Sequence, residues 1–295
     1  MIKQKRKFLI PLFAAIPVAL LSIVMILEAL CYNGTSYFLP FVDNGGVFKF
    51  TDIRVFGIRL YYILMIIGLM VAVIVSLQKR EQYGYTKLQA AVLTILYFLQ
   101  AFLGAKILFG VEKVIGAGTL KAWNMSGLSL FGTLYLSLIF VPIFAVFFHK
   151  KVTDTFDFIT PTWLILLSFV RFGCFISGCC GARQMVFHGF PVRLPVQLFE
   201  VICDLCILSL CLWIDQPKQE KNRKEFRAFP LLLVTYCFTR FLLEFLRNNE
   251  ITSLGITISQ VHCVAFLLIG IVSLLKIRGK VDYNKGKNPR KFDKK

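Results

Sequence analysis

The chain has 295 residues, of which 57% are hydrophobic and 17% charged, whereas soluble globular domains carry about 25% charged residues. This composition excludes an ordinary soluble domain. The formal net charge of +18 would suggest nucleic acid as the partner of a soluble protein, but the basic residues lie mostly between apolar runs, where topology and anionic lipid explain them better. We therefore expect a membrane-embedded chain with no nucleic-acid partner.

Eight apolar runs are long enough to cross a membrane. A helix needs roughly 20 residues to span about 30 Å of hydrocarbon at a rise of 1.5 Å per residue. The predicted spans are 8–30, 55–77, 88–109, 128–148, 156–178, 195–213, 229–246 and 256–275. The sequence thus predicts an all-α, polytopic transmembrane helix bundle of about eight spans.

Lysine and arginine set the expected orientation. Most of the 34 basic residues lie at the N-terminus, in alternate loops and in the C-terminal tail, so both termini are expected in the cytoplasm. The first span could instead be a signal peptide, but its apolar stretch is long and no A-x-A cleavage site follows, which favours an uncleaved helix. We expect three parts: a basic N-terminus with an extra span and outer loop (1–54), a membrane domain (55–276) and a basic tail (277–295).

The seventh predicted span carries polar residues that a lipid-facing helix would not tolerate. Tyr236, Arg240, Glu244 and Arg247 are spaced by four, four and three residues, which places them along one stripe of a helix. A charge at the middle of a transmembrane helix costs at least about 2.5 kcal/mol. This stripe is therefore the first candidate for a functional site.

The fifth predicted span carries a second deep arginine, Arg171. It lies about 21 Å along an outward-running helix, at 1.5 Å per residue, and so in the outer half of the membrane. Gly173, Cys174 and Gly178 flank it, and such small residues permit a close helix contact or the close approach of a ligand.

Further polar residues are predicted to reach the same depth from other spans. They are Tyr61 at the start of the second span, Lys106 near the end of the third, and Gln197 and Glu200 at the start of the sixth. Two deep arginines at matched depth need an anion, and a lipid phosphate is the best candidate because the guanidinium fork binds phosphate through two hydrogen bonds. We expect the site in the outer third of the membrane.

Structural alternatives remain open for several of these residues. Arg247, Lys106 and Arg59 could extend to the lipid headgroups, and Tyr61 could be an interfacial aromatic residue. Arg240 and Glu244 could form an i,i+4 pair that satisfies only itself.

Nine cysteines lie mostly in apolar runs, where a free cysteine behaves as a small hydrophobic residue. Cys174, Cys179 and Cys180 cluster beside Arg171, and a nearby cation can lower a thiol pKa and make it reactive. Their spacing is not a zinc-ligand pattern, so packing residues, a nucleophile or a redox pair stay open. We expect no metal and no cofactor.

At these residues the chain resembles the bacterial prolipoprotein diacylglyceryl transferase family, over about residues 55–275. YCFTRFLLEFLR resembles the family's Y-G-x-x-R-F-x-x-E-F-x-R, and RFGCFISGCCG resembles G-R-x-G-N-F-x-N-G-E without its leading glycine. GIRLYYILMIIGL, FLGAKI, LPVQLFE and TISQ resemble four further family segments in the same order. These four matches are less specific than the match of YCFTRFLLEFLR.

The resemblance implies transfer of a diacylglyceryl group from phosphatidylglycerol, or another anionic phospholipid, to a cysteine of a secreted prolipoprotein signal peptide. The location implied is the bacterial plasma membrane, with the site near the outer leaflet. Catalytic residues would be Arg171, Arg240, Glu244 and Tyr236. Substrate-binding residues would be Tyr61, Lys106, Cys174, Gly178, Gln197, Glu200 and Arg247.

Three residues depart from the family pattern. Phe131 stands at the family histidine, Cys174 at an asparagine and Cys179 at a glutamate. Phenylalanine cannot accept a proton, so the base of the reaction must differ or activity has been lost. The alternatives are a thiol that acts in catalysis, a non-catalytic protein that binds phospholipid or scaffolds a partner, and a membrane thiol-redox protein.

Overall fold

The structure is a computed structural model that describes residues 20, 23, 54–123, 127–177, 179–181, 184–187, 190–215, 227–247 and 255–287. The predicted first span, the loop 216–226 and the end of the basic tail lie outside these residues, apart from Leu20 and Ile23 in the span. The other seven predicted spans each contain a helix.

Each helix overlaps one of the predicted spans, but the helices that begin at Lys87 and Ile258 run well beyond the predicted ends at residues 109 and 275. The helices are α2 (Leu60–Lys79), α3 (Lys87–Ala117), α4 (Phe131–Phe147), α5 (Val152–Ile176), α6 (Val196–Ile214), α8 (Ala228–Glu244) and α9 (Ile258–Lys287), with short 3-10 turns at Arg80–Tyr83 and Leu120–Ala122. Within the described residues, five stretches are long and apolar enough to cross a membrane: Leu60–Tyr83, Lys87–Ala117, Val152–Ile176, Val196–Ile214 and Ile258–Gly279. The predicted all-α, multi-span membrane fold is confirmed, whereas the number of eight spans stays a prediction.

Two short hairpins were not predicted by the apolar pattern. β1 (Arg54–Val55) pairs with β2 (Ile58–Arg59), and β3 (Gln184–Phe187) pairs with β4 (Phe190–Arg193), both antiparallel. Phe56 and Gly57 form the first turn, with φ of +52° and +79°, as the tight two-residue turns of hairpins require. The helix α2 in the predicted span 55–77 therefore begins at Leu60 and not at residue 55.

The chain forms two compact units. One contains Met1–Val71 and Trp163–Lys295, and the other contains Ala72–Thr162. In the second unit α3 packs on α4. Gly104 and Gly132 face each other there, and a Cβ on either would collide with the backbone of the opposite helix. Glycine at both positions is what lets these two helices approach closely.

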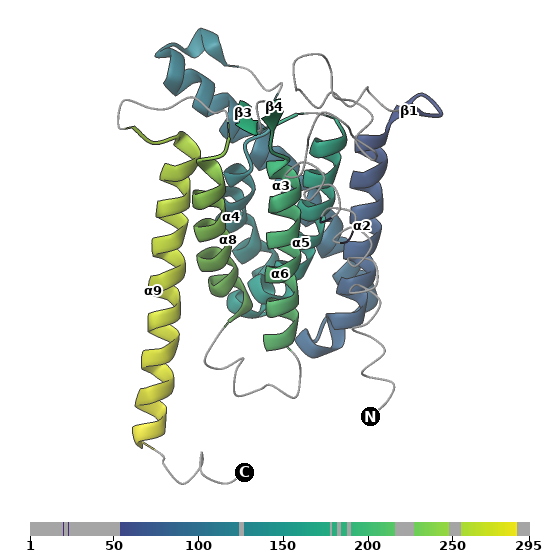
Figure 1. Cartoon of the computed structure of the whole chain (residues 1–295). Helices are drawn as coiled ribbons and strands as arrows, with labels where there is room; N and C mark the ends of the chain where they lie inside the picture. Colours follow the sequence, from purple (N-terminus) through teal and green to yellow (C-terminus); the bar gives the residue numbers. More distant parts are fainter. Residues whose placement is uncertain are drawn as a thin grey trace. The chain divides into compact units, whose positions relative to one another are not determined.

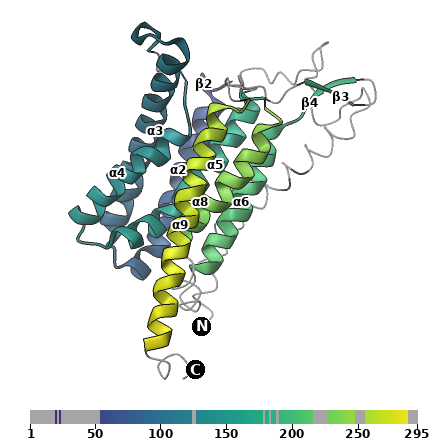
Figure 2. The same cartoon turned by 90° about the vertical axis from the view of Figure 1, so that its left-hand side faces the viewer.

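In the first unit, α8 packs against both α6 and α9, and Figures 1 and 2 show α8 and α9 side by side. α5 and α8 end, and α6 and α9 begin, at the end of this unit that carries the β3–β4 hairpin (Figure 1). Five polar side chains from these helix ends meet in the protein interior. This arrangement positions the candidate site.

Candidate functional site

Glu200, in the first turns of α6, is the centre of a buried ion cluster. Its Oε2 lies 3.0 Å from Nε of Arg171 on α5. Its Oε1 lies 2.9 Å from Nη1 of Arg240 on α8 and 3.3 Å from Nη1 of Arg247, just after α8. One carboxylate therefore joins three arginines from two other elements.

Glu244, at the end of α8, is the second carboxylate of the cluster. Its Oε2 lies 2.8 Å from Nη1 of Arg240 and 3.6 Å from Nε of Arg247. Its Oε1 accepts a hydrogen bond of 3.0 Å from the hydroxyl of Thr257. Thr257 also caps α9 by a reciprocal pair of bonds with Gln260, the capping-box arrangement, so the TISQ segment fixes the start of α9 against the cluster.

We call Arg171, Glu200, Arg240, Glu244 and Arg247 the ion cluster. Each side chain is at most 8% exposed. Buried charges persist only when they are paired and hydrogen-bonded. Three guanidinium groups here face two carboxylates, and the buried carboxyl of Asp204 lies beside them. N–H groups of Arg171 and Arg240 that the carboxylates do not use are suited to bind an anion.

The structure decides between several sequence-based alternatives. Arg247 is buried in the protein and paired with both carboxylates, so the prediction that it could extend to lipid headgroups was wrong. The predicted pair of Arg240 with Glu244 is present, but Arg240 also binds Glu200 and the pair is not self-contained. The anion that Arg171 and Arg240 require is supplied at least in part by Glu200, a role that the sequence did not indicate.

Two buried polar atoms beside the ion cluster lack a hydrogen-bond partner among the described residues: the hydroxyl of Tyr236 and Oδ2 of Asp204. Tyr236 packs its ring edge-to-face against Trp163, with centroids 4.9 Å apart. Asp204, only 1% exposed, was missed by the sequence analysis. Its spacing of four residues from Glu200 places both on one face of α6, and this signal could have found it.

Tyr61, at the start of α2, lies against Gly173 on α5. A Cβ on Gly173 would meet Cδ2 of the Tyr61 ring at 2.8 Å, so only glycine leaves room for the ring. Tyr61 also stacks edge-to-face on Tyr62, with centroids 5.4 Å apart. The predicted site residue Tyr61 is thereby brought within one turn of Arg171.

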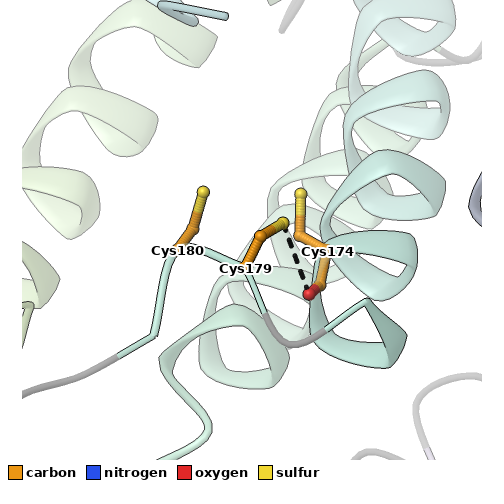
Figure 3. Close-up of side chains that lie close together, drawn as sticks. All are labelled: Cys174, Cys179 and Cys180. Atoms are coloured by element: carbon orange, nitrogen blue, oxygen red, sulfur yellow. Dashed lines mark hydrogen bonds between the residues drawn. The ribbon is translucent and has the colours of Figure 1, made fainter. Parts of the chain in front are cut away.

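Cys174, Cys179 and Cys180 form a thiol cluster at the end of α5. Their three sulfur atoms lie within 4.8 Å of one another, and Figure 3 shows the side chains of Cys174 and Cys180 pointing to the same side of the loop. Hydrogen bonds from the Cys174 and Cys179 thiols lower the pKa of Cys180, and Arg171 and Arg247 act in the same direction. All three cysteines are free thiols.

Hydrogen bonds hold the loop that carries Cys179 and Cys180. The amide of Cys179 donates to the carbonyl of Cys174 over 3.1 Å, and the Cys179 thiol donates to the same oxygen over 3.5 Å (Figure 3). Gln197, at the start of α6, donates to the carbonyl of Cys179 over 2.6 Å. Gln197 thus fixes the thiol loop to α6, one turn before Glu200.

The structure does not test whether the remaining predicted site residues belong to this arrangement. Lys106 lies on α3, in the other compact unit, with its Nζ 5.6 Å from the centre of the Phe102 ring. Gly178 lies outside the described residues. Phe131, at the family histidine position, is the first residue of α4 and is 2% exposed.

A family model described as prolipoprotein diacylglyceryl transferase matches residues 49–276. This stretch contains every described helix except the last turns of α9.

Several named proteins are similar to the chain over most of their length. A phosphatidylglycerol–prolipoprotein diacylglyceryl transferase 2 of Clostridium perfringens (strain 13 / Type A) is 26% identical over 76% of this chain and 93% of its own. A phosphatidylglycerol–prolipoprotein diacylglyceryl transferase of Clostridium tetani (strain Massachusetts / E88) is 24% identical over 74% and 93%. A protein of that name in Streptococcus uberis (strain ATCC BAA-854 / 0140J) is 23% identical over 75% and 91%.

Proposed function

Because the chain belongs to the prolipoprotein diacylglyceryl transferase family, we propose that it transfers the diacylglyceryl group of phosphatidylglycerol to a prolipoprotein cysteine. The printed names of the relatives give this donor and this acceptor for those proteins. The observation that carries the proposal to this chain is the buried ion cluster, in which Arg171 and Arg240 keep N–H donors that Glu200 and Glu244 do not use.

A lipid phosphate would bind guanidinium donors that the carboxylates of the ion cluster do not use. Arg240 uses Nη1 for both carboxylates, and its buried Nε has no hydrogen-bond partner among the described residues. Arg171 engages Glu200 through Nε, and a guanidinium has five N–H donors in all. Donors of both arginines therefore remain for a phosphate, while Glu200 and Glu244 hold the guanidinium planes in place.

The chemistry needs what this arrangement supplies. The acceptor thiolate attacks the glyceryl carbon that bears the phosphate ester, a C–S bond forms, and the C–O bond breaks with its electron pair on the leaving glycerol phosphate. Negative charge thus develops on the phosphate in the transition state, and fixed guanidinium groups in a buried site would stabilise it. Tyr236 and Tyr61 would line the lipid site.

We place the reaction at the outer leaflet of the bacterial plasma membrane, with both chain termini in the cytoplasm. The distribution of lysine and arginine between the apolar runs supports this orientation. A secreted acceptor is accessible only from that side.

The direct test is conversion of a lipobox peptide by membranes that contain the full chain and phosphatidylglycerol. The expected result is a mass increase of one diacylglyceryl group for the wild type and none for Arg240→Ala. Arg80→Ala is the matched control, because Arg80 pairs with Glu81 outside the ion cluster. An inactive wild type, tested with several lipids and peptides, would count heavily against the proposal.

A second candidate is a non-catalytic protein that binds phospholipid on the same fold. Phe131 favours it, because a buried phenylalanine at the family histidine position cannot move a proton. Under this alternative a photoactivatable phospholipid would crosslink to the protein, with no lipidated peptide formed. Crosslinking together with turnover would decide for the transferase.

A further inference from the structure

The thiol cluster is not needed to hold the lipid phosphate, and packing alone does not explain it. Cys174 is buried at the last full turn of α5, whereas Cys179 and Cys180 are exposed. Their sulfurs nevertheless converge within 4.8 Å. Cys180 adopts a φ of +61°, a left-handed conformation that is unfavourable for residues other than glycine.

We propose that Cys174, Cys179 and Cys180 bind one Zn²⁺ ion and leave its fourth position open for the acceptor thiol. The metal site stands on the geometry of this chain, and its role toward the acceptor rests on the proposed transferase function.

The sulfur positions fit zinc with little movement. Tetrahedral zinc binds cysteine sulfur at about 2.3 Å, which places pairs of sulfurs about 3.8 Å apart. The three sulfurs already lie within 4.8 Å of one another. The two exposed cysteines, Cys179 and Cys180, would close the difference by rotation about their side-chain bonds. The C-x₄-C-C spacing does not follow the usual zinc-finger patterns, so the site is visible only in three dimensions.

The donor set and its surroundings also select zinc. Thiolates favour zinc among the common divalent ions, and three protein ligands with an open position distinguish catalytic zinc sites from closed structural ones. The loop is fixed by Gln197, which donates to the carbonyl of Cys179. Arg171, one turn before Cys174, adds positive charge that favours thiolates over thiols.

Zinc in this position would prepare the acceptor for transfer. A thiol that coordinates zinc gives up its proton, here to water, and the metal-bound sulfur keeps its electron pair for attack on the glyceryl carbon. The C–O bond to the phosphate breaks as the C–S bond forms, and glycerol phosphate leaves with the bonding pair. Because the thioether product is neutral and binds zinc weakly, it departs and the open position is restored.

The first measurement is metal content, which does not depend on turnover. Full-length protein purified in detergent with Zn²⁺ and freed of excess metal should retain about one ion per chain. The double variant Cys179→Ser/Cys180→Ser should retain none. Cys206→Ser is the matched control, since Cys206 is an exposed thiol on α6 outside the cluster, and it should retain zinc as the wild type does.

The second measurement reports the open position. Replacement of Zn²⁺ by Co²⁺ should give thiolate-to-cobalt charge-transfer absorption in the wild type and not in the double variant. A lipobox peptide should increase this absorption as a fourth thiolate binds, whereas the same peptide with serine in place of its cysteine should leave it unchanged.

The outcomes separate this inference from the proposed function. A wild type that binds no zinc, or whose three cysteines form disulfides, overturns the inference. If the double variant still converts the peptide, the proposed transferase function is retained without the zinc site. Zinc bound by the three cysteines, with a cobalt spectrum that responds to the peptide thiol, supports the inference. A cobalt spectrum that does not change when the peptide is added overturns the role of the metal in acceptor binding. A wild type that binds zinc but converts no peptide contradicts the proposed function.

Discussion

Two buried polar networks of the chain differ in one respect that bears on function. In the unit Ala72–Thr162, the side chains of Gln100 and Tyr97 on α3 meet Ser137 on α4 through neutral hydrogen bonds of 3.1 and 3.2 Å. In the other unit, the ion cluster joins α5, α6 and α8 through formal charges. Both networks are buried, but only the second is expensive to bury.

The two networks suit different tasks: the neutral network holds helices together, whereas the ion cluster is suited to bind a ligand. Neutral hydrogen bonds between membrane helices stabilise by about 0.6 kcal/mol on average, which suffices to fix α3 against α4 beside the Gly104–Gly132 contact. Five charges are not needed for that purpose, and ionisable residues within membrane spans mark functional sites by default. Four substitutions test the contrast, from the largest expected effect to the smallest.

Glu200→Ala should have the largest effect. It removes a carboxylate that pairs with three arginines. Glu244 still pairs with Arg240 and Arg247, but Arg171 loses the carboxylate it is paired with. Loss of one partner from a buried ion pair typically costs about 3–5 kcal/mol, so thermal unfolding in detergent, followed by helical circular dichroism, should shift sharply downward and transfer should cease. Glu81→Ala removes an exposed carboxylate and should change the unfolding free energy by less than about 0.5 kcal/mol.

Arg240→Lys should damage activity more than stability. Lysine keeps the charge but loses the planar fork that reaches both carboxylates and a phosphate. Loss of a hydrogen bond to a charged group costs about 1.5–3 kcal/mol, equivalent to a fall in transfer rate on the order of 10- to 100-fold. Arg80→Lys serves as control. Equal peptide conversion by Arg240→Lys and the wild type would show that the guanidinium is not used on the substrate.

Gly173→Ala should act through Tyr61. The added methyl would lie 2.8 Å from the ring, and overpacking of this kind costs about 1–3 kcal/mol. We expect lower thermal stability and weaker retention of phospholipid during purification. Gly116→Ala is the matched control because a Cβ there meets nothing within 4 Å. If both variants behave alike, the contact of Tyr61 with α5 does not shape the lipid site.

Ser137→Ala should have the smallest effect. It removes one neutral partner of Gln100 and Tyr97, at a cost of about 0.6 kcal/mol. Peptide conversion should stay at the wild-type level. A loss of transfer comparable with that of Arg240→Lys would contradict the division of roles between the two networks.

The helices were largely predictable because membrane spans need long apolar runs, and the positions of seven of them follow from those runs. The stripe from Tyr236 to Arg247 was predictable from its helical spacing. The hairpins were not, since two- to four-residue strands leave no hydrophobic period. They set the start of α2 and lead into α6.

The connections within the site were harder to predict than its members. Sequence spacing indicates which residues share one helix face, but it does not say that Glu200 binds three arginines from two other elements. Asp204 was overlooked because it lies within an apolar run beside Cys203 and Cys206. The thiol cluster depends on a turn after α5, with Cys180 at positive φ, and no periodic pattern records such a turn.

The most direct test of the account is a side-by-side assay of a lipobox peptide with phosphatidylglycerol and three proteins: the wild type, Arg240→Ala and Ser137→Ala, each shown to be folded by circular dichroism. We expect a diacylglyceryl mass shift with the wild type and Ser137→Ala, and none with Arg240→Ala. Full conversion by folded Arg240→Ala, or none by the folded wild type, would contradict the claim that the ion cluster binds the lipid phosphate for transfer.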